Sequence, residues 1–490
     1  MPSRPLLLAT LLACSSASSP SSSPHLDAST HADAPHSAPD ASDARPRDAA
    51  THDAPAGPPL VTQAGYFDLP AQATAAKYPA RMFWSFRPAD TSPNDRPLLV
   101  LFDGGPGGAT TANLLPYGTG PMTLDPDGGA PVANAASFTR FANLLYLDER
   151  QSGLSYGLGD ASPANVNARC TFSILDDAAD FIRAIAAFLE GHGSLSQSKV
   201  VLVGESYGGT RTTAILHLAA SHADASVTMP SDVRQFLGAH AAQLGEAVLI
   251  EPLVAGAVQF LAQQQLTATD PYLAAFNSPA ENSDAGCVDS YDVQHPCGWS
   301  DGLAANAAAA LASADASTAL LGVDLATIPD LLPAARTSAF RTTTGTADPS
   351  AAAFVSRFGA LGPEDAYWSG VECACSGYIP TQDGTAASWF IPVLLTSRLF
   401  ITNARYDAVI YSPAIPYILQ HDAQLATTID TTPQAGVARP GWIHVTLPTD
   451  AGTSHVEIRF PSYTSSGHMV AVSQGADLAD DVEAWLASLP

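Results

Sequence analysis

The sequence predicts an α/β fold in which helices cover a mostly parallel sheet. Continuous apolar runs, such as Pro97–Phe102 and Lys199–Val203, have the length and composition of strands that are buried on both faces. Other segments carry apolar residues at helical spacing, as Asp177–Glu190 does. Strands that alternate with helices in this way usually pair in parallel, so we expect one central sheet to carry most of the core.

Further runs extend the expected sheet. Asn143–Asp148, Ala247–Ile250 and Arg398–Thr402 each read as a buried strand, and Val456–Phe460 alternates in polarity as strands do. A helix-like stretch from Arg234 to Leu244 precedes the second of these runs. In sheets of this kind ligands bind beyond the carboxyl ends of the strands, so functional residues are expected there.

Residues 256–394 differ from the rest in being rich in Ala, Asp, Ser and Thr. They contain local helical runs such as Leu303–Leu321. We expect a helical lid inserted above the carboxyl ends of the strands. Its aromatic residues are candidates either for lining a substrate pocket or for packing within the lid: Trp299, Tyr367, Trp368 and Trp389.

One serine lies on a turn between a predicted strand and a predicted helix. Gly204-Glu-Ser-Tyr-Gly208 follows the strand at Lys199–Val203 and precedes the helical segment Thr210–Ala220. Small residues on both sides allow a sharp turn that presents the serine Oγ to a base and a substrate carbonyl. We therefore predict Ser206 as a nucleophile. An ordinary Gly-rich turn is the alternative, because G-x-S-x-G also occurs by chance.

In this strand–turn–helix arrangement an acid and then a histidine follow the serine in chain order. Asp407 comes just after the predicted strand Arg398–Thr402, and His468 lies in a Gly-containing loop before the last helix. A histidine takes the serine proton during attack, and a carboxylate holds that histidine in the right tautomer. We predict Asp407 as the orienting acid and His468 as the general base. The rival candidates lie inside probable strands or do not follow an apolar strand: His444, His455, Asp422 and Asp450.

A glycine-dense turn follows the predicted strand Pro97–Phe102. Asp103-Gly-Gly-Pro-Gly-Gly108 can bring backbone N–H groups close to a ligand. In hydrolases with a nucleophile on such a turn, the oxyanion hole uses the N–H after the nucleophile and one from the loop after an early strand. This predicts Tyr207 and Gly105. A phosphate-binding loop is the alternative, but no G-x-x-x-x-G-K-[ST] pattern follows.

Together, in this order, the motifs resemble the serine carboxypeptidases, and most of all their bacterial branch. The resemblance covers residues 61–255 and 395–490, and it implies an α/β-hydrolase core with a variable insertion. It also implies that Ser206, Asp407 and His468 form a catalytic triad and that Gly105 and Tyr207 form the oxyanion hole. Gly104 and Glu205 would belong to the clamp on the substrate's terminal carboxylate. The matching residues are Gly104–Gly107, Leu145–Asp148, Gly204–Gly209 with Arg211, Tyr406-Asp407 and Gly467–Met469.

One residue of the clamp departs from the family pattern. Members typically carry Asn at the position of Asp103, and an ionised Asp103 would repel a peptide's C-terminal carboxylate. Two neighbouring carboxyl groups, here Asp103 and Glu205, tend to share a proton, and the protonated one can still donate a hydrogen bond. We therefore expect any carboxypeptidase activity to be confined to acidic pH. A second glutamate that eukaryotic members place before their Gly-Pro is absent, since Gly118-Thr119 precede Gly120-Pro121.

The amino terminus reads as an export signal. Arg4 supplies a positive charge before the apolar run Leu6–Ala13, which is too short to span a bilayer. Leu11–Cys14 resembles the lipobox of bacterial lipoproteins, so we expect lipidation of Cys14, with simple cleavage as the alternative. Residues 15–60, rich in Ser, Ala, Pro, Asp and His, are expected to be a flexible linker to the catalytic domain, residues 61–490. The protein is thus expected in the periplasm, on the outer membrane or cell surface as a lipoprotein, or secreted.

The net charge limits the classes of partner that the protein can bind. A net charge of −26 argues against binding of nucleic acid and against docking on anionic lipid, so only a lipid anchor would bring the chain to a membrane.

The cysteines after Cys14 are odd in number, and two disulfides with one free thiol is the simplest expectation. The mechanism requires no cofactor and no metal. The candidate pairs are Cys287 with Cys297, and Cys170 with Cys373 or Cys375. For Cys373 and Cys375, metal binding is the alternative.

These observations predict an exported serine hydrolase that trims peptides from the C-terminus through an acyl-enzyme. Two alternatives remain. An aminopeptidase or esterase of the same fold is favoured by Asp103, and Asp148–Arg150 is similar to the proline-iminopeptidase branch. The second alternative is a surface lipoprotein that has kept the fold, has lost catalysis and acts as a binding module.

Overall fold

The structure is a computed structural model, and it describes most of the chain after residue 59. The described residues are 60–72, 79–105, 107–150, 152–157, 173–254, 259, 266, 289, 291–295, 299–329, 331, 383–410, 412–421, 425–432, 437–449 and 452–490. The predicted signal segment, Cys14, the linker and all the predicted disulfide cysteines lie outside these residues. None of the described helices is long and apolar enough to cross a membrane.

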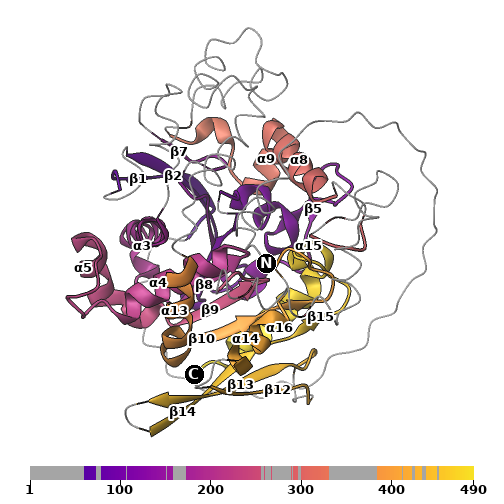
Figure 1. The fold of residues 1–490 in the computed structure, drawn as a ribbon. Coiled ribbons are helices and arrows are strands. Elements are labelled where there is room, and N and C mark those ends of the chain that lie inside the picture. The colour runs from indigo at the N-terminus through magenta and orange to yellow at the C-terminus, as the bar shows by residue number, and fades with distance from the viewer. Residues whose placement is uncertain are drawn as a thin grey trace, which may run out of the picture.

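The centre of the molecule is one large, mostly parallel sheet (Figure 1). Its strand order is β1-β2-β6-β3-β8-β9-β10-β14-β13-β12, with β7 paired to β2. The pairs from β6 to β14 are parallel, whereas the strands at both ends pair antiparallel. The strands are β1 Gln63–Leu69, β2 Ala80–Arg87, β3 Leu98–Phe102, β6 Asn143–Leu147, β7 Tyr156–Gly157, β8 Val200–Glu205, β9 Glu246–Ile250, β10 Arg398–Ile401, β12 Ala426–Asp430, β13 Trp442–Thr449 and β14 Gly452–Arg459. Two small sheets add β4 Met122–Thr123 with β5 Val132–Ala133, and β11 Asn403–Ala404 with β15 Ser462–Tyr463.

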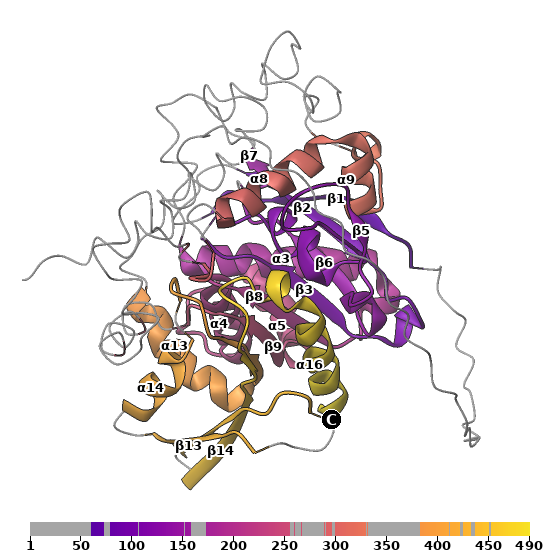
Figure 2. The same ribbon diagram turned by 90° about the vertical axis from the view of Figure 1, so that its right-hand side faces the viewer.

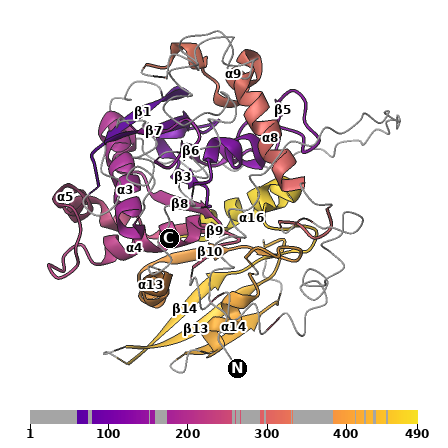
Figure 3. The same cartoon turned by 45° about the horizontal axis from the view of Figure 1, so that its top comes forward.

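Alternate residues of the central strands pack on opposite faces of the sheet, as strand geometry requires. Leu98, Val100 and Phe102 join the apolar cluster on the face covered by α3, α4 and α5, while Leu99 and Leu101 join the cluster on the face covered by α16. Figures 2 and 3 show these helices on the two sides of the sheet. The helices are α3 Ile174–Gly191, α4 Gly208–Ala220, α5 Ser231–His240, α8 Trp299–Ala312, α9 Ala314–Leu321, α13 Asp383–Thr396, α14 Ala414–His421, α15 Val470–Ser473 and α16 Gly475–Ser488.

The expected parallel strands and the helices between them are confirmed, because long apolar runs and helical periodicity are strong signals. Helix α3 begins where Ser173 caps it, its side chain accepting a hydrogen bond from the Asp176 N–H at 3.4 Å. Within the predicted insertion, the helical run expected at Leu303–Leu321 forms α8 and α9, which are divided at Ser313 because this serine caps α9.

Other parts of the predicted insertion lie close to the sheet. Helix α13 lies mostly within residues 256–394, ending two residues beyond them, and packs against α4. Its Trp389 stacks on His217 of α4 with ring centroids 4.7 Å apart. Trp299, at the start of α8, stacks on His295 at 4.2 Å. Tyr367 and Trp368, also proposed as pocket residues, lie outside the described residues. The two described tryptophans thus have packing partners in place.

Candidate active site

The turn that carries Ser206 joins β8 to α4 and has a strained backbone. Ser206 has a φ of 57°, in the left-handed region that side-chain-bearing residues seldom adopt. Hydrogen bonds to the end of the next strand hold the turn: the Ser206 N–H donates to the Ile250 carbonyl at 3.0 Å, and the Ser206 carbonyl accepts from the Leu253 N–H at 2.8 Å. The turn is tight because a Cβ on Gly204 would lie 2.4 Å from the Gly208 carbonyl oxygen. The predicted sharp strand-to-helix turn is therefore present.

Asp407 and His468 meet in a buried pair, 61 residues apart in the chain. Asp407 Oδ2 lies 2.8 Å from His468 Nδ1, and Oδ1 accepts hydrogen bonds from the N–H groups of Val409 and Ile410 at 2.8 and 3.0 Å. Burial lowers the pKa of His468, but the charge and hydrogen bond of Asp407 outweigh it, so the pKa is raised above its usual value. This arrangement stabilises the imidazolium and fixes which ring nitrogen faces away from the acid.

The outward nitrogen of the histidine is left without a partner. His468 Nε2 is buried and accepts or donates no hydrogen bond within the described part of the chain. No hydrogen bond joins it to the Ser206 hydroxyl, although such bonds often tighten only when substrate is bound. A buried, unpartnered ring nitrogen is unfavourable unless something uses it. It is the atom that a serine proton would reach in the predicted mechanism.

The rival residues lie elsewhere. His444 is on β13, where its ring lies 3.4 Å from Glu457 and 3.8 Å from Asp430. His455 is on β14, and its Nδ1 lies 3.2 Å from the Thr446 hydroxyl. Asp422 and Asp450 lie outside the described residues. The structure therefore pairs His468, rather than either of these histidines, with Asp407.

The glycine turn after β3, residues 103–108, lies directly against the nucleophile turn, residues 204–208, which carries Ser206. A Cβ on Gly104 would lie 2.5 Å from Ser206 Cβ and 2.6 Å from the Tyr207 nitrogen, so only glycine fits. Gly105 has a φ of 102°, which glycine adopts readily, and the turn closes through a 2.8 Å bond from the Gly108 N–H to the Gly104 carbonyl. The segments that carry the Gly105 and Tyr207 N–H groups are thus in contact. Their role as an oxyanion hole stays a prediction.

Two carboxyl groups and one amide form the candidate clamp. Asn113 Nδ2 donates to Glu205 Oε2 at 3.0 Å and lies 3.4 Å from Asp103 Oδ1, which also accepts the Gly104 N–H at 2.7 Å. Burial raises the pKa of Glu205 well above its usual value, and the charge of Asp103 raises it further. Burial also raises the pKa of Asp103, against the hydrogen bonds from Gly104 and Asn113. The pair therefore keeps a proton at a pH where isolated carboxyl groups are ionised.

Asn113 and Tyr291 are site residues that sequence reasoning missed. Asn113 lies in a short irregular segment after the glycine turn, and nothing in its spacing distinguishes it. Tyr291 belongs to the insertion, where its carbonyl accepts the His468 N–H at 2.5 Å and its ring meets the imidazole edge-on at 5.0 Å. Gly467 is required beside it, since a Cβ there would lie 2.0 Å from the Tyr291 carbonyl oxygen.

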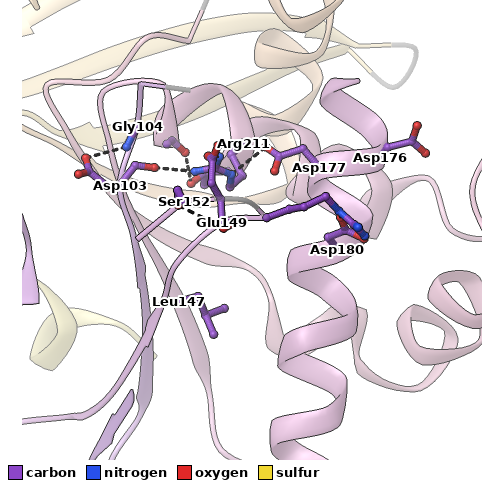
Figure 4. A network of polar contacts seen from close by, with 12 residues as sticks. Asp103, Gly104, Leu147, Glu149, Ser152, Asp176, Asp177, Asp180 and Arg211 are labelled. Atoms are coloured by element: carbon purple, nitrogen blue, oxygen red, sulfur yellow. Dashed lines mark hydrogen bonds and ion pairs between the residues drawn. The ribbon is translucent and has the colours of Figure 1, made fainter. Parts of the chain in front are cut away.

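A buried cation ties the glycine turn to the helix layer (Figure 4). Arg211, on α4, donates from Nε to Asp177 Oδ2 at 2.8 Å, from Nη2 to Glu149, and from Nη1 to the Asp103 carbonyl. Its guanidinium also lies over the Phe181 ring, 4.4 Å from the centroid. Burial raises the pKa of Glu149 and of Asp177, and the charge of Arg211 opposes this in both. One side chain thus connects the segments after β3 and β6 with α3 and α4.

Removing this cation should destabilise the protein strongly. Arg211→Ala leaves two buried carboxyl groups unpaired, so we expect a loss of about 3–5 kcal/mol in the free energy of unfolding. Urea unfolding followed by circular dichroism measures it. Arg140→Ala is the matched control, because Arg140 pairs with the exposed Asp480 and should lose less than about 1 kcal/mol. Equal losses in the two variants would contradict the role given to Arg211.

The contact between the two turns should be equally sensitive. Gly104→Ala would push Ser206 away from the glycine turn, so we expect its reaction with a fluorophosphonate probe to slow on the order of 100-fold. Gly238→Ala is the control, since a Cβ on this glycine of α5 meets nothing within 4 Å. Labelling rates followed by mass spectrometry decide the matter. A Gly104→Ala protein that reacts as fast as the wild type would show that the contact is not needed.

Comparison with known proteins adds the family context. Residues 54–234 match the family model described as serine carboxypeptidase. Over 157 residues the chain is 31% identical to Carboxypeptidase sxa2 of Schizosaccharomyces pombe, which covers 32% of this chain and 27% of that protein. Over 103 residues it is 33% identical to Carboxypeptidase S1 homolog B of Arthroderma otae, covering 20% of this chain and 16% of that protein. The chain thus spans less than a third of the length of these relatives.

A solved structure extends the likeness over the whole fold. The crystal structure of a prohormone-processing carboxypeptidase from Saccharomyces cerevisiae superposes with a TM-score of 0.53 and 13% identity, covering 87% of this chain and 91% of that one. At this identity the likeness shows the fold alone. The predicted fold class is therefore confirmed: the chain has the α/β-hydrolase fold, and over residues 54–234 it matches the serine carboxypeptidase family.

Proposed function

We propose that this chain is an exported serine carboxypeptidase of the bacterial branch, which releases C-terminal residues from peptides through an acyl-enzyme on Ser206. The observation that carries the proposal is the buried pair of Asp407 and His468, in which Nε2 has no hydrogen-bond partner among the described residues. We place this pair in one site with Ser206, which lies on a strained turn. The family match over residues 54–234 supports the class of reaction. The bacterial branch rests on the sequence motifs, since the relatives named above are fungal.

The chemistry follows from these positions. As the Ser206 hydroxyl attacks the scissile carbonyl, His468 Nε2 accepts its proton, and Asp407 stabilises the imidazolium through Nδ1. The N–H groups of Gly105 and Tyr207 stabilise the oxyanion that forms. His468 then gives the proton to the leaving amine, which departs with the C-terminal residue. A water molecule, deprotonated by His468, hydrolyses the acyl-enzyme and restores the serine.

The carboxyl pair gives the exopeptidase preference and its pH dependence. When Asp103 and Glu205 hold at least one proton, they donate to the substrate's terminal carboxylate, with Gly104 beside them. As pH rises and the pair loses that proton, two negative charges repel the same carboxylate. At low pH the raised pKa of His468 keeps it protonated and unable to act as a base. Peptide hydrolysis is therefore limited at low pH by protonation of His468, and it falls as pH rises and the carboxyl pair loses its proton.

Export rests on the sequence of the first residues. The charged and apolar segment before Cys14 directs secretion, and lipidation of Cys14 would anchor the catalytic domain through the linker of residues 15–60. The mature protein would then act in the periplasm or at the cell surface, or free in the medium if it is cleaved without lipidation. Metabolic labelling with palmitate separates the two, since only the lipoprotein incorporates the label.

Asp103 also supports a second candidate function. A carboxyl pair at the end of the site suits a substrate ammonium group better than a carboxylate, as in an aminopeptidase of the same fold. Dipeptides blocked at one end separate the two. A carboxypeptidase hydrolyses the N-blocked dipeptide, an aminopeptidase the C-blocked one, and an esterase neither.

The decisive experiment is hydrolysis of an N-blocked dipeptide from acid to mildly alkaline pH. We expect activity on the acidic side that Ser206→Ala reduces at least ~10³-fold. Asp103→Asn removes one negative charge from the clamp, so KM should fall about tenfold near neutral pH and activity should extend upward. The same peptide with a C-terminal amide is the control, because its KM should not respond to Asp103→Asn.

Two results would count against this assignment. A wild-type pH profile that stays flat up to neutral pH would remove the shared-proton clamp. Hydrolysis that persists in Ser206→Ala would show that another group performs the reaction.

A further inference from the structure

Glu251 is a buried glutamate whose backbone lies beside the nucleophile turn. It follows β9 and has a φ of 41°, in the left-handed region that is unfavourable for residues other than glycine. The residue before it accepts the Ser206 N–H, and Leu253, two residues after it, donates to the Ser206 carbonyl. The position of Glu251 is therefore fixed on both sides by bonds to the nucleophile turn. Backbone strain of this kind persists only where the surroundings enforce it.

The side chain of Glu251 reaches the loop that carries the acid. Oε1 accepts hydrogen bonds from the Thr402 hydroxyl at 2.7 Å and the Ala404 N–H at 2.8 Å, and Oε2 accepts from the Ser412 hydroxyl at 2.5 Å. The Thr402 hydroxyl in turn accepts the Glu251 N–H at 2.8 Å. These partners precede and follow Asp407 in the chain. One carboxyl group thus closes both ends of the loop that presents Asp407 to His468.

The charge of Glu251 is coupled to the same pair. Burial raises the pKa of Glu251 to about 8, with a further contribution from the charge of Asp407, while His468 and the hydrogen bonds from Ser412 and Thr402 oppose it. The charge of Asp103 also raises the pKa of His468, and the charge of Asp407 raises the pKa of Glu205. The raised pKa means that Glu251 takes up its negative charge at a higher pH than an ordinary glutamate, near pH 8.

We propose that Glu251 is a positioning residue for the acid and the base of this site: its hydrogen bonds hold the Asp407 loop to the Ser206 turn, and its carboxylate, once ionised, stabilises the imidazolium of His468. The inference rests on the proposed function of Ser206, Asp407 and His468. The hydrogen bonds to Thr402, Ala404 and Ser412 carry the positioning. Oε1 accepts from Thr402 and Ala404 in both states of Glu251, while the Ser412 hydroxyl donates to the carboxylate and accepts from the protonated carboxyl group. Ionisation of Glu251 then adds a negative charge near Asp407 and His468 without breaking the contacts that position the loop.

This gives an expected response to pH. When the Ser206 hydroxyl attacks a reagent, His468 takes its proton and becomes positively charged. A nearby negative charge stabilises this imidazolium. The carboxyl groups that act on Glu251 and His468 are Asp407 and Asp103, and Glu205 is coupled to both of these. The Tyr291 phenol meets the His468 ring edge-on, and its pKa is raised by burial and by the charges of Asp103, Asp289, Asp407 and Glu205. Ionisation of Glu251 near pH 8 should therefore add a second rise in reactivity above the one caused by deprotonation of His468.

The test uses a fluorophosphonate probe on the full-length protein from pH 5 to 9.5, because this reagent needs Ser206 and His468 but no peptide clamp. Glu251→Gln keeps a neutral side chain that can make the same bonds, so its labelling rate at pH 6–7 should stay within about threefold of the wild type, without the second rise. Glu251→Ala should label on the order of 100-fold more slowly at every pH, through loss of the positioned loop. Glu246→Gln is the matched control, since Glu246 begins the same strand and pairs with Lys199 and Arg398.

The outcomes separate cleanly. Glu251→Ala at the wild-type rate would overturn the positioning role, and superimposable profiles for the wild type and Glu251→Gln would overturn the electrostatic one. If Glu251→Ala does not fold, the comparison with Glu251→Gln still decides. A wild type that does not react contradicts the proposed function instead. The imidazole NMR signals of His468 then test Glu251 alone: a shift near pH 8 in the wild type that Glu251→Gln lacks supports the inference, and its absence overturns it.

Discussion

The buried guanidinium of Arg211 sets the geometry on which the rest of the site is built. It lies at the start of α4, immediately after the nucleophile turn, and its partners Asp177 and Glu149 come from α3 and from the segment after β6. A bond to the Asp103 carbonyl adds the glycine turn. A cation in this position is stable only if all its partners stay in place. The strained φ of Ser206 and the close approach of the glycine turn are therefore kept by charge as well as by packing.

The sequence predicts the centre of the fold well because two physical signals coincide there. Strands such as Leu98–Phe102 are buried on both faces, so they appear as unbroken apolar runs, and the helices between them show their own period. Residues just beyond the ends of parallel strands share one edge of the sheet. That rule singled out Asp407, and the structure joins it to His468 at 2.8 Å across 61 residues.

The rest of the site could not be predicted because its residues act through tertiary contacts. Asn113 and Tyr291 lie in irregular segments, and neither spacing nor composition distinguishes them from ordinary loop residues. Glu251 is different, since it is an acid directly after a buried strand, which is the signal that identified Asp407. Its function depends on Thr402 and on a loop far along the chain, and the sequence does not show that contact. Of the antiparallel strands at the sheet edges, β13 and β14 were expected as the probable strands that hold His444 and His455, whereas β1, β2 and β12 were missed. β1 and β12 bury few of their residues, so their apolar signal is weak.

Residues 291–295 of the insertion make contacts with the loops that carry the predicted acid and base. The Tyr291 carbonyl holds the backbone of His468, and the Val293 N–H donates to the Tyr406 carbonyl, next to the acid, at 3.1 Å. Asp289, two residues before Tyr291, accepts hydrogen bonds from the N–H and the hydroxyl of Ser300 in α8. These described residues of the insertion therefore help to hold His468, the predicted base, in place. A deletion of residues 291–295 would remove the carbonyl that holds the backbone of His468, so we expect it to impair the predicted base even with the side chains of Ser206, Asp407 and His468 intact.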